Sequence, residues 1–430
     1  MKTIGLFFLA LVLSHNIVMS QDSLRVYKSG QITLQRAVQD IDSIKFENKS
    51  NAATNHYDSL YVYKAGISVN KSATVDIDSL IFTKPAPLFA QIVYTSDLHY
   101  GISRTFRGGS SVDASVVNLA MINQINKVPA ATFPADNGVN AGKPVGYVDY
   151  VAITGDITNK MNKAPTATVS WAKFNTDFLN GISTKNQKGL NSEFLLTCGN
   201  HDVSNAIGIF KTMTPATDNA SMLNIYNLMM KPTPLKTTAT YNYYNDKPNY
   251  SKDIAGVHLM FVVMWPDSAN RIWMEKDLSN VSKTTPVLIF THDPVACESS
   301  HFTNPIGDHS ISDSYENQIE ERYKSDVIEQ RGWVAFVKIH PNIKAYFHGH
   351  SNDNEYYTFT GPDGGINLKI YRVDSPMKGS ISGNDETKLS FQVLAIDGNT
   401  KTLTVRECLW NTSGAASAIV WGTNSTISLK

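Results

Sequence analysis

The chain has 430 residues, and its 38 lysines and arginines are balanced by 38 aspartates and glutamates. This zero net charge, with no Lys/Arg run longer than two, argues against the broad basic surface on which stable nucleic-acid binding depends. It leaves room for a phosphorylated small molecule or a phosphorylated lipid as substrate, because bound metal ions supply positive charge of their own.

Residues 1–20 predict a secretory signal peptide. Lys2 precedes an apolar run over residues 4–13, and small residues near Ser20 offer a cleavage site. An apolar run of this length is too short to cross a bilayer. No later segment has 18 consecutive apolar residues. We therefore expect an exported protein without a transmembrane segment, located in the periplasm, on the outer surface or outside the cell.

Residues 21–84 carry a tandem repeat that predicts short strands. Segments 23–47 and 59–83 match without gaps at an offset of 36 residues, with turns at Gly30 and Gly66. Units this small bury little apolar surface alone, so we expect them to pack on each other or on the main domain. They contain no catalytic motif, which favours a spacer or surface-docking role. Two prolines within 85–90 predict a linker.

From residue 91 the sequence alternates between apolar strands and helical periodicity. The predicted strands are 91–96, 148–154, 192–198, 257–265, 286–291 and 343–347, and the predicted helices are 113–126, 168–182 and about 319–338. This alternation predicts an α/β domain over residues 91–430. From about residue 355 the pattern becomes all-β, and Asp-Gly-Asn-Thr at 397–400 predicts a hairpin.

Five short motifs follow the predicted strands. They place Asp97 and His99 in "SDLHYG", Asp156 in "TGDI", Asn200, His201 and Asp202 in "GNHD", His292 in "THDP", and His348, His350 and Asn352 in "HGHSN". Carboxylate, imidazole and amide groups together suit first-row divalent metal ions. Loops that leave one edge of an α/β sheet can converge, so we expect these side chains to form one metal site.

The ordered set resembles the calcineurin-like metallophosphoesterases, whose motifs are D-x-H, G-D, G-N-H-[DE], a lone His and G-H-x-H. The resemblance spans about 91–354 and implies a four-layer αββα sandwich that holds two divalent metal ions, Mn, Zn or Fe. It also implies that Asp156 bridges the two ions. On the same pattern Asp97 and His99 bind one ion, and Asn200 and His292 bind the other.

The last motif allows two registers. The family has a glycine directly before the first histidine of its last pair, and alignment on Gly349 makes His350 and Asn352 the ligands. The other register uses His348 and His350. Asparagine at the second position departs from the commonest pattern but is similar to the 5′-nucleotidase branch. Because an amide oxygen replaces an imidazole there, the site is tilted toward harder ions.

By the same resemblance, His201 faces the leaving-group oxygen, and Asp202 holds the His201 imidazole in its working tautomer. The expected activity is hydrolysis of phosphate esters by water that two metal ions activate. Two alternatives remain open. One is an acid sphingomyelinase-like phosphodiesterase on the same core, and the other is an exported binding protein that keeps the fold as an inactive scaffold. The complete ligand set argues against the second alternative.

Overall fold

The structure, a computed structural model, divides the chain into two compact units, Met1–Pro87 and Leu88–Lys430. It describes residues 23–28, 31–37, 41, 43–47, 59–64, 67–73, 79–83, 88–159, 166–203, 220–242, 245–296 and 322–430. The predicted signal peptide lies outside the described residues, so the structure leaves that prediction as it stands.

The N-terminal unit contains two three-stranded sheets. Their strand orders are β2 (Gln31–Ala37), β1 (Ser23–Lys28), β6 (Ser79–Thr83) and β3 (Ser43–Glu47), β4 (Ser59–Lys64), β5 (Ile67–Ala73). In each sheet the third strand of one repeat pairs with the first strand of the other repeat. One apolar cluster joins both repeats and contains Leu24, Val26, Leu34, Leu60 and Val62. The repeats therefore pack on each other, one of the two arrangements that their small size predicts.

The C-terminal unit is built on two six-stranded sheets. The first sheet has the order β11 (Glu193–Leu196), β10 (Tyr150–Ile153), β7 (Phe89–Thr95), β18 (Ser390–Asp397), β19 (Thr402–Leu409), β20 (Val420–Ser428). The second has the order β12 (Tyr250–Ile254), β13 (Val257–Phe261), β14 (Val287–Phe290), β15 (Ile343–His348), β17 (Leu368–Arg372), β16 (Glu355–Phe359). Strands β7, β10 and β11 run parallel, as do β13, β14, β15 and β17.

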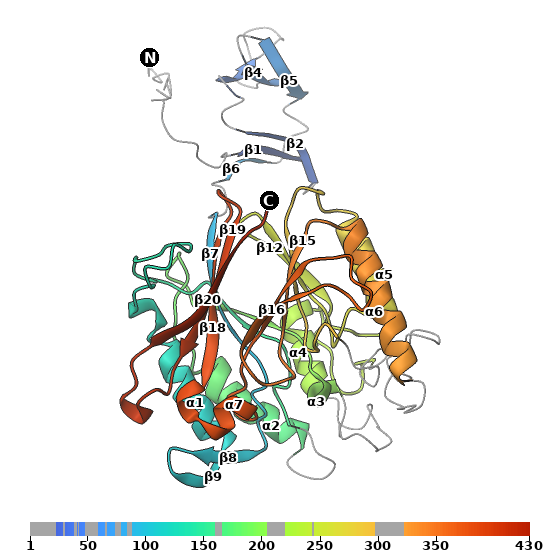
Figure 1. The fold of residues 1–430 in the computed structure, drawn as a ribbon. Coiled ribbons are helices and arrows are strands. Elements are labelled where there is room, and N and C mark those ends of the chain that lie inside the picture. Colours follow the sequence, from blue (N-terminus) through green and yellow to red (C-terminus); the bar gives the residue numbers. More distant parts are fainter. Residues whose placement is uncertain are drawn as a thin grey trace. The chain divides into compact units, whose positions relative to one another are not determined.

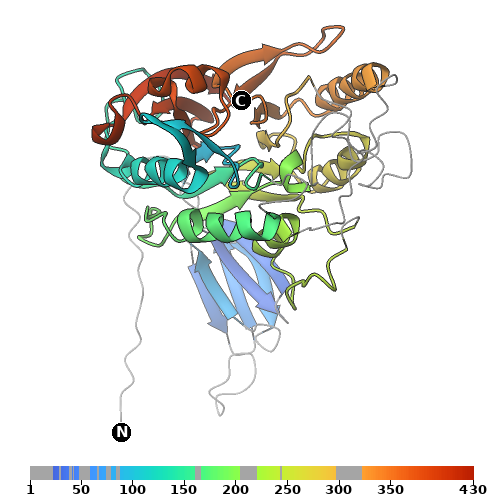
Figure 2. The same ribbon diagram turned by 90° about the horizontal axis from the view of Figure 1, so that it is seen from below.

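Helices cover the outer face of each sheet. Figure 1 shows α1 and α2 on one side of the sheets and α5 and α6 on the other, and Figure 2 shows the same layers from below. The helices are α1 (Ala114–Ile125), α2 (Ala167–Phe174), α3 (Asn200–Val203), α4 (Ala220–Met230), α5 (Ser268–Leu278), α6 (Arg322–Ile339) and α7 (Ser380–Asn384). A π-helical segment, Asn175–Leu179, continues α2, and a small hairpin joins β8 (Ser103–Phe106) to β9 (Gly109–Asp113).

Alternating side chains explain the four layers. In β7, Ile92 and Tyr94 enter the apolar cluster between the two sheets, whereas Val93 belongs to the cluster beneath α1 and α2. In β13, Leu259 enters the cluster between the sheets and Met260 packs toward α5 and α6. Because successive residues of a strand point to opposite faces, strands with apolar residues throughout need cover on both sides. The predicted αββα sandwich is confirmed.

A row of stacked aromatic rings crosses the second sheet from strand to strand. Phe290 lies between Phe261 and Phe347, with ring centroids 4.9 and 4.5 Å away, and Phe347 stacks on Tyr371 at 4.9 Å. Tyr94 of the first sheet meets Phe290 edge-on at 5.8 Å. Each such pair adds about 0.5–1.5 kcal/mol beyond apolar burial. The row fixes the strands whose ends carry the last two sequence motifs.

The C-terminal all-β part differs from the predicted extension, because its strands complete both sheets of the core. Strand β18 pairs with β7, the first strand of the domain, and β17 pairs with β15. The region also contains the short helix α7. Pairing partners so distant in sequence leave no local signal, so strand periodicity predicts the strands but not their places.

Two predicted boundaries also shift. Strand β7 begins at Phe89, where it pairs with Asp397, so the predicted linker 85–90 is too long at its end. Strand β13 ends at Phe261 rather than at residue 265, because the chain turns at Met264, whose φ is 61°. The apolar run continues past the strand end because these turn residues are buried too.

We expect a shortened chain that begins at Pro85 to fold and to keep its metal affinity and most of its turnover on a small substrate. The reason is that the described strands β1 to β6 pair only with one another, and every motif lies downstream. Circular dichroism melting and metal titration of the full and shortened chains provide the check. A soluble, metal-loaded but inactive shortened chain would show that the repeats contribute to the site.

Candidate metal centre

The predicted ligands converge because the loops that carry them leave neighbouring strand ends. Asp97 follows β7 and Asp156 follows β10, and the Asp97 N–H donates to Gly155 O at 2.9 Å. In the second sheet the Gly349 N–H donates to His292 O at 3.0 Å, which joins the loops after β14 and β15. The carboxyl ends of parallel strands thus gather loops that lie far apart in sequence.

Five predicted ligands have left-handed backbone conformations. Their φ angles are 56° at Asp97, 43° at His99, 49° at Asp156, 62° at His350 and 62° at Asn352. A residue with a side chain pays on the order of 1–3 kcal/mol for such a conformation, and these conformations cluster at functional sites. The loops are held there by hydrogen bonds such as those from His99 N to Asp156 O and from His350 N to Asp97 Oδ2, both 2.9 Å.

Glycines allow the loops to touch backbone to backbone. Gly155 has a φ of 98°, and a side chain there would collide with the backbone of Gly199. A side chain at Gly349 would strike the Oγ of Ser96 and the Oδ2 of Asp97. Residues other than glycine at these positions would push the motif loops apart.

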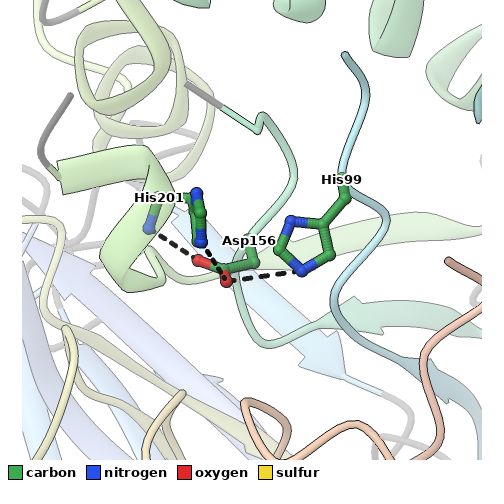
Figure 3. A group of neighbouring side chains, drawn as sticks. All are labelled: His99, Asp156 and His201. Carbon is green, nitrogen blue, oxygen red and sulfur yellow. Dashed lines mark hydrogen bonds and ion pairs between the residues drawn. The ribbon is translucent and has the colours of Figure 1, made fainter. Parts of the chain in front are cut away.

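Asp156 lies at the centre of the site. One of its oxygens, Oδ2, is 3.6 Å from His99 Nε2 and 3.9 Å from His201 Nε2, and Figure 3 shows these three side chains facing one another. The other oxygen, Oδ1, is 3.5 Å from His292 Nε2. Two groups of potential ligands therefore share Asp156, which has the place that a bridging ligand requires. The first contains His99 and His201 and the second His292 and His350, and the potential ligand atoms within each group lie within 4.8 Å of one another.

The second group presents lone pairs to a common point. His292 Nδ1 lies 2.7 Å from Thr154 O, and because a carbonyl only accepts, this nitrogen carries the proton and leaves Nε2 free as a ligand. His292 Nε2 is 2.9 Å from Asn200 Oδ1 and 3.3 Å from His350 Nδ1. With the Asn200 amide reversed, its nitrogen would donate to both histidine nitrogens. A bound ion between these atoms would instead require the orientation with the oxygen inward.

Electrostatics show what an ion would replace at His292. Burial alone would lower the pKa of His292, but Asp156, Asp97 and Asp293 raise it to about 10. Without an ion, the imidazole therefore holds a proton against these buried carboxylates. A divalent ion would displace that proton and offset the same negative charge.

Buried polar atoms without hydrogen bonds test whether the predicted ligands of the ion near Asp97 suit a metal. Within the described residues, Asp97 Oδ1, both ring nitrogens of His99, and Asn352 Oδ1 are buried without hydrogen-bond partners. Buried polar atoms are rarely left in this state. Asp97 Oδ1 lies 3.6 Å from His99 Nε2, a separation that leaves both atoms available to an ion. Carboxylate, imidazole and amide groups are donors that divalent ions accept, so the side chains present suit the implied metals.

The structure separates the two registers of the last motif. His348 is fully buried, with Nδ1 2.9 Å from Gly349 O and Nε2 3.2 Å from the Tyr357 hydroxyl. Burial lowers the pKa of His348 to about 3. His350 Nδ1, in contrast, lies 3.2 Å from Asn200 Oδ1. His350 thus lies beside the other candidate ligands, whereas His348 packs against Tyr357.

Asp202 does not have the contact expected of it. Its oxygens accept hydrogen bonds from Thr158 N and Gly199 N, both 3.0 Å, and from Ser221 Oγ at 2.7 Å. His201 Nδ1 has no hydrogen-bond partner among the described residues. The prediction that Asp202 orients His201 is wrong, because neighbouring residues of the one-turn helix α3 do not face each other. Instead, Asp202 joins two motif loops, and burial raises its pKa to about 6.

Two further residues reach the site without a recognised motif. Lys378, in the loop after β17, has its Nζ 3.3 Å from His201 Nε2. Asp293 is buried, with Oδ1 3.8 Å from His350 Nδ1. The signal for Asp293 is its place directly after His292. A single lysine in a polar loop carries no comparable signal.

Sequence comparison identifies the family. The family model of calcineurin-like phosphoesterases matches residues 90–353, which is more than half of the chain. The chain therefore belongs to the calcineurin-like phosphoesterase family, as the five ordered motifs predict. A search of curated protein sequences finds no significant match.

Solved structures with a similar arrangement include other phosphoesterases. A purple acid phosphatase from yellow lupin (Lupinus luteus) seeds is 12% identical, with a TM-score of 0.42, over 95% of this chain and 69% of its own. The phosphopantetheinyl hydrolase of Mycobacterium tuberculosis is 11% identical, with a TM-score of 0.29, over 68% of this chain and 92% of its own. Likeness at this level adds no argument about substrate.

Metal titration of three variants tests the register. We expect His350→Ala to lose the most affinity, Asn352→Ala to weaken the ion near Asp97, and His348→Ala to be mildest. A residue that only supports ligands still costs about 10- to 100-fold in affinity or activity, so the ranking is the observable. Calorimetric titration with Mn²⁺ and Zn²⁺ measures it.

Asn352→His is the matched control for this ranking. It places an imidazole where the commonest family pattern has one, and should retain or strengthen metal affinity. If His348→Ala damages metal binding more than Asn352→Ala does, the register that uses His348 is the right one.

Proposed function

We propose that this protein is an exported phosphoesterase that holds two divalent metal ions and hydrolyses phosphate esters. The observation that supports this most is the position of Asp156, whose two oxygens face two separate groups of metal-binding side chains. Family membership supports the same chemistry. When bound, the two ions would supply a water of lowered pKa and would offset charge on the phosphoryl oxygens.

Two different sets of side chains would bind the two ions. One ion would be held by Asp97, His99 and Asn352, the other by Asn200, His292 and His350, with Asp156 shared. His201 borders the Asp156 cluster and is nearly buried, so we place its imidazole beside the leaving-group oxygen. Asp202 would keep the loops in register rather than take part in proton transfer.

Export is the second part of the proposal and is supported by the N-terminal sequence alone. Among the described residues, no helix has the length and apolar character to cross a membrane. The N-terminal repeats would then act as a spacer or surface-docking unit. An inactive scaffold is disfavoured because each predicted ligand is present, and buried polar atoms left without partners would destabilise a fold with no use for metal.

The variant Asp156→Asn tests the hypothesis that the site holds two metal ions. We expect the variant to fold, to lose at least one metal ion, and to lose turnover by on the order of 10³-fold or more, because the amide offers only one ligand oxygen. Metal content is measured by mass spectrometry. Turnover is measured on p-nitrophenyl phosphate and bis(p-nitrophenyl) phosphate with Mn²⁺, Zn²⁺, Fe²⁺ and Ca²⁺.

Asp363→Asn provides the control, since it removes an exposed carboxylate whose partner is Arg331. Metal content and turnover should both stay unchanged in that variant. Full activity of an Asp156→Asn protein with verified metal content would overturn the proposal.

A further inference from the structure

A segment beyond the matched family region reaches into the site. It follows β17 and is tied to two of the motif loops through Ser375. The Ser375 hydroxyl donates to Asp97 O at 2.8 Å, and the Ser375 N–H donates to Asn352 O at 3.4 Å. The matched family region ends at residue 353, so Ser375 lies outside it while both of its partners lie inside.

Hydrogen bonds from the Arg104 guanidinium group and to the Asp374 carboxyl group hold the same segment in place. Arg104 donates to the carbonyl oxygens of Pro376 and Ser382, both at 2.7 Å. Buried Asp374 accepts from Ser382 Oγ at 2.9 Å and from Ser390 N at 3.1 Å. With both ends fastened, the turn is positioned before any substrate arrives, which reduces the entropy cost of binding.

The turn presents Lys378 to the site. The Lys378 N–H donates to Ser375 Oγ at 2.9 Å, and a side chain at the following Gly379 would collide with Asn352 O at 2.6 Å. At the end of the side chain, Nζ lies 3.3 Å from His201 Nε2, which itself is 3.9 Å from Asp156 Oδ2. The ammonium group therefore lies beside the first group of ligands, next to His201.

Lys378 is accessible and has a distinctive charge in this place. The residue as a whole is exposed, so a substrate can reach it, although protein groups surround much of its ammonium group. Burial lowers the pKa of its ammonium group, while Asp156 and Asp97 oppose that shift. Among the described residues, no other lysine or arginine makes a hydrogen bond or ion pair with the predicted ligands or with His201.

We propose that Lys378 binds a terminal oxygen of the substrate phosphoryl group and makes the site selective for phosphate monoesters over diesters. This inference rests on the proposed phosphoesterase function. A monoester is a dianion with three terminal oxygens at neutral pH, whereas a diester is a monoanion with two. The ammonium group would add a third positive charge beside two metal ions, and its Coulomb attraction is stronger for a dianion than for a monoanion. The ammonium has three donors, so it can keep His201 while it binds the substrate.

The test compares two substrates and two lysines in the metal-loaded full chain. For Lys378→Gln, kcat/KM on p-nitrophenyl phosphate should fall about 10- to 100-fold, the range for a lost charge-assisted hydrogen bond. The value on bis(p-nitrophenyl) phosphate should fall less than about threefold, because a monoanion gains less from the cation. Lys378→Arg should restore most monoester turnover.

Binding of inorganic phosphate gives a readout that is independent of turnover. The Kd for phosphate, measured by calorimetry at equal metal content, should rise about 10- to 100-fold in Lys378→Gln. The Kd for diethyl phosphate should stay nearly constant. Lys369→Gln is the matched control, because this lysine of β17 bonds only to Thr358 Oγ1 among the described residues. It should change neither Kd nor the substrate preference.

Three outcomes would overturn the assignment of Lys378. They are an equal loss on both substrates, an unchanged phosphate Kd in Lys378→Gln, and a wild-type preference for the diester. A wild-type protein that hydrolyses neither ester would instead contradict the proposed function, and the two phosphate affinities would still decide whether Lys378 binds the anion.

Discussion

The burial of one carboxylate, that of Asp156, governs the arrangement of the whole C-terminal unit. Its side chain is enclosed by groups from both sheets, and its Oδ1 accepts a hydrogen bond from His201 N at 2.7 Å. Burying a charge costs several kcal/mol unless partners offset it. The partners here come from loops that meet only when the two sheets pack face to face, so the sandwich and the site require each other.

The sequence predicts most of this arrangement because its signals are local. Short continuous apolar runs mark the core strands, and polar motifs directly after them mark the edge where the loops meet. The glycine at 349, directly before His350, is also a local signal, and the structure brings His350 rather than His348 to Asn200. Each of these signals arises from residues adjacent in the chain, so it can be recognised in a single sequence.

Other features depend on long-range packing and are invisible in the sequence. The direction of Asp202 depends on Thr158 and Ser221, which reach it from other loops. The insertion of β18 beside β7 joins residues about three hundred positions apart. The sequence likewise carries no signal that the two N-terminal repeats exchange strands. Lys378 belongs with them, because only the folded loop brings it to His201.

The site therefore combines the metal-binding motifs of the family with a segment that lies beyond the matched region. Motif loops on parallel strands place the metal-binding groups, and this placement defines the reaction class that the family shares. The strands after residue 353 complete both sheets, and the turn between them adds a cation that the family pattern does not specify. Since function resides in sites carried by a fold, the choice among phosphate esters is best sought in that turn. Its anchoring by Arg104 and Asp374 fixes the position of this turn beside the site.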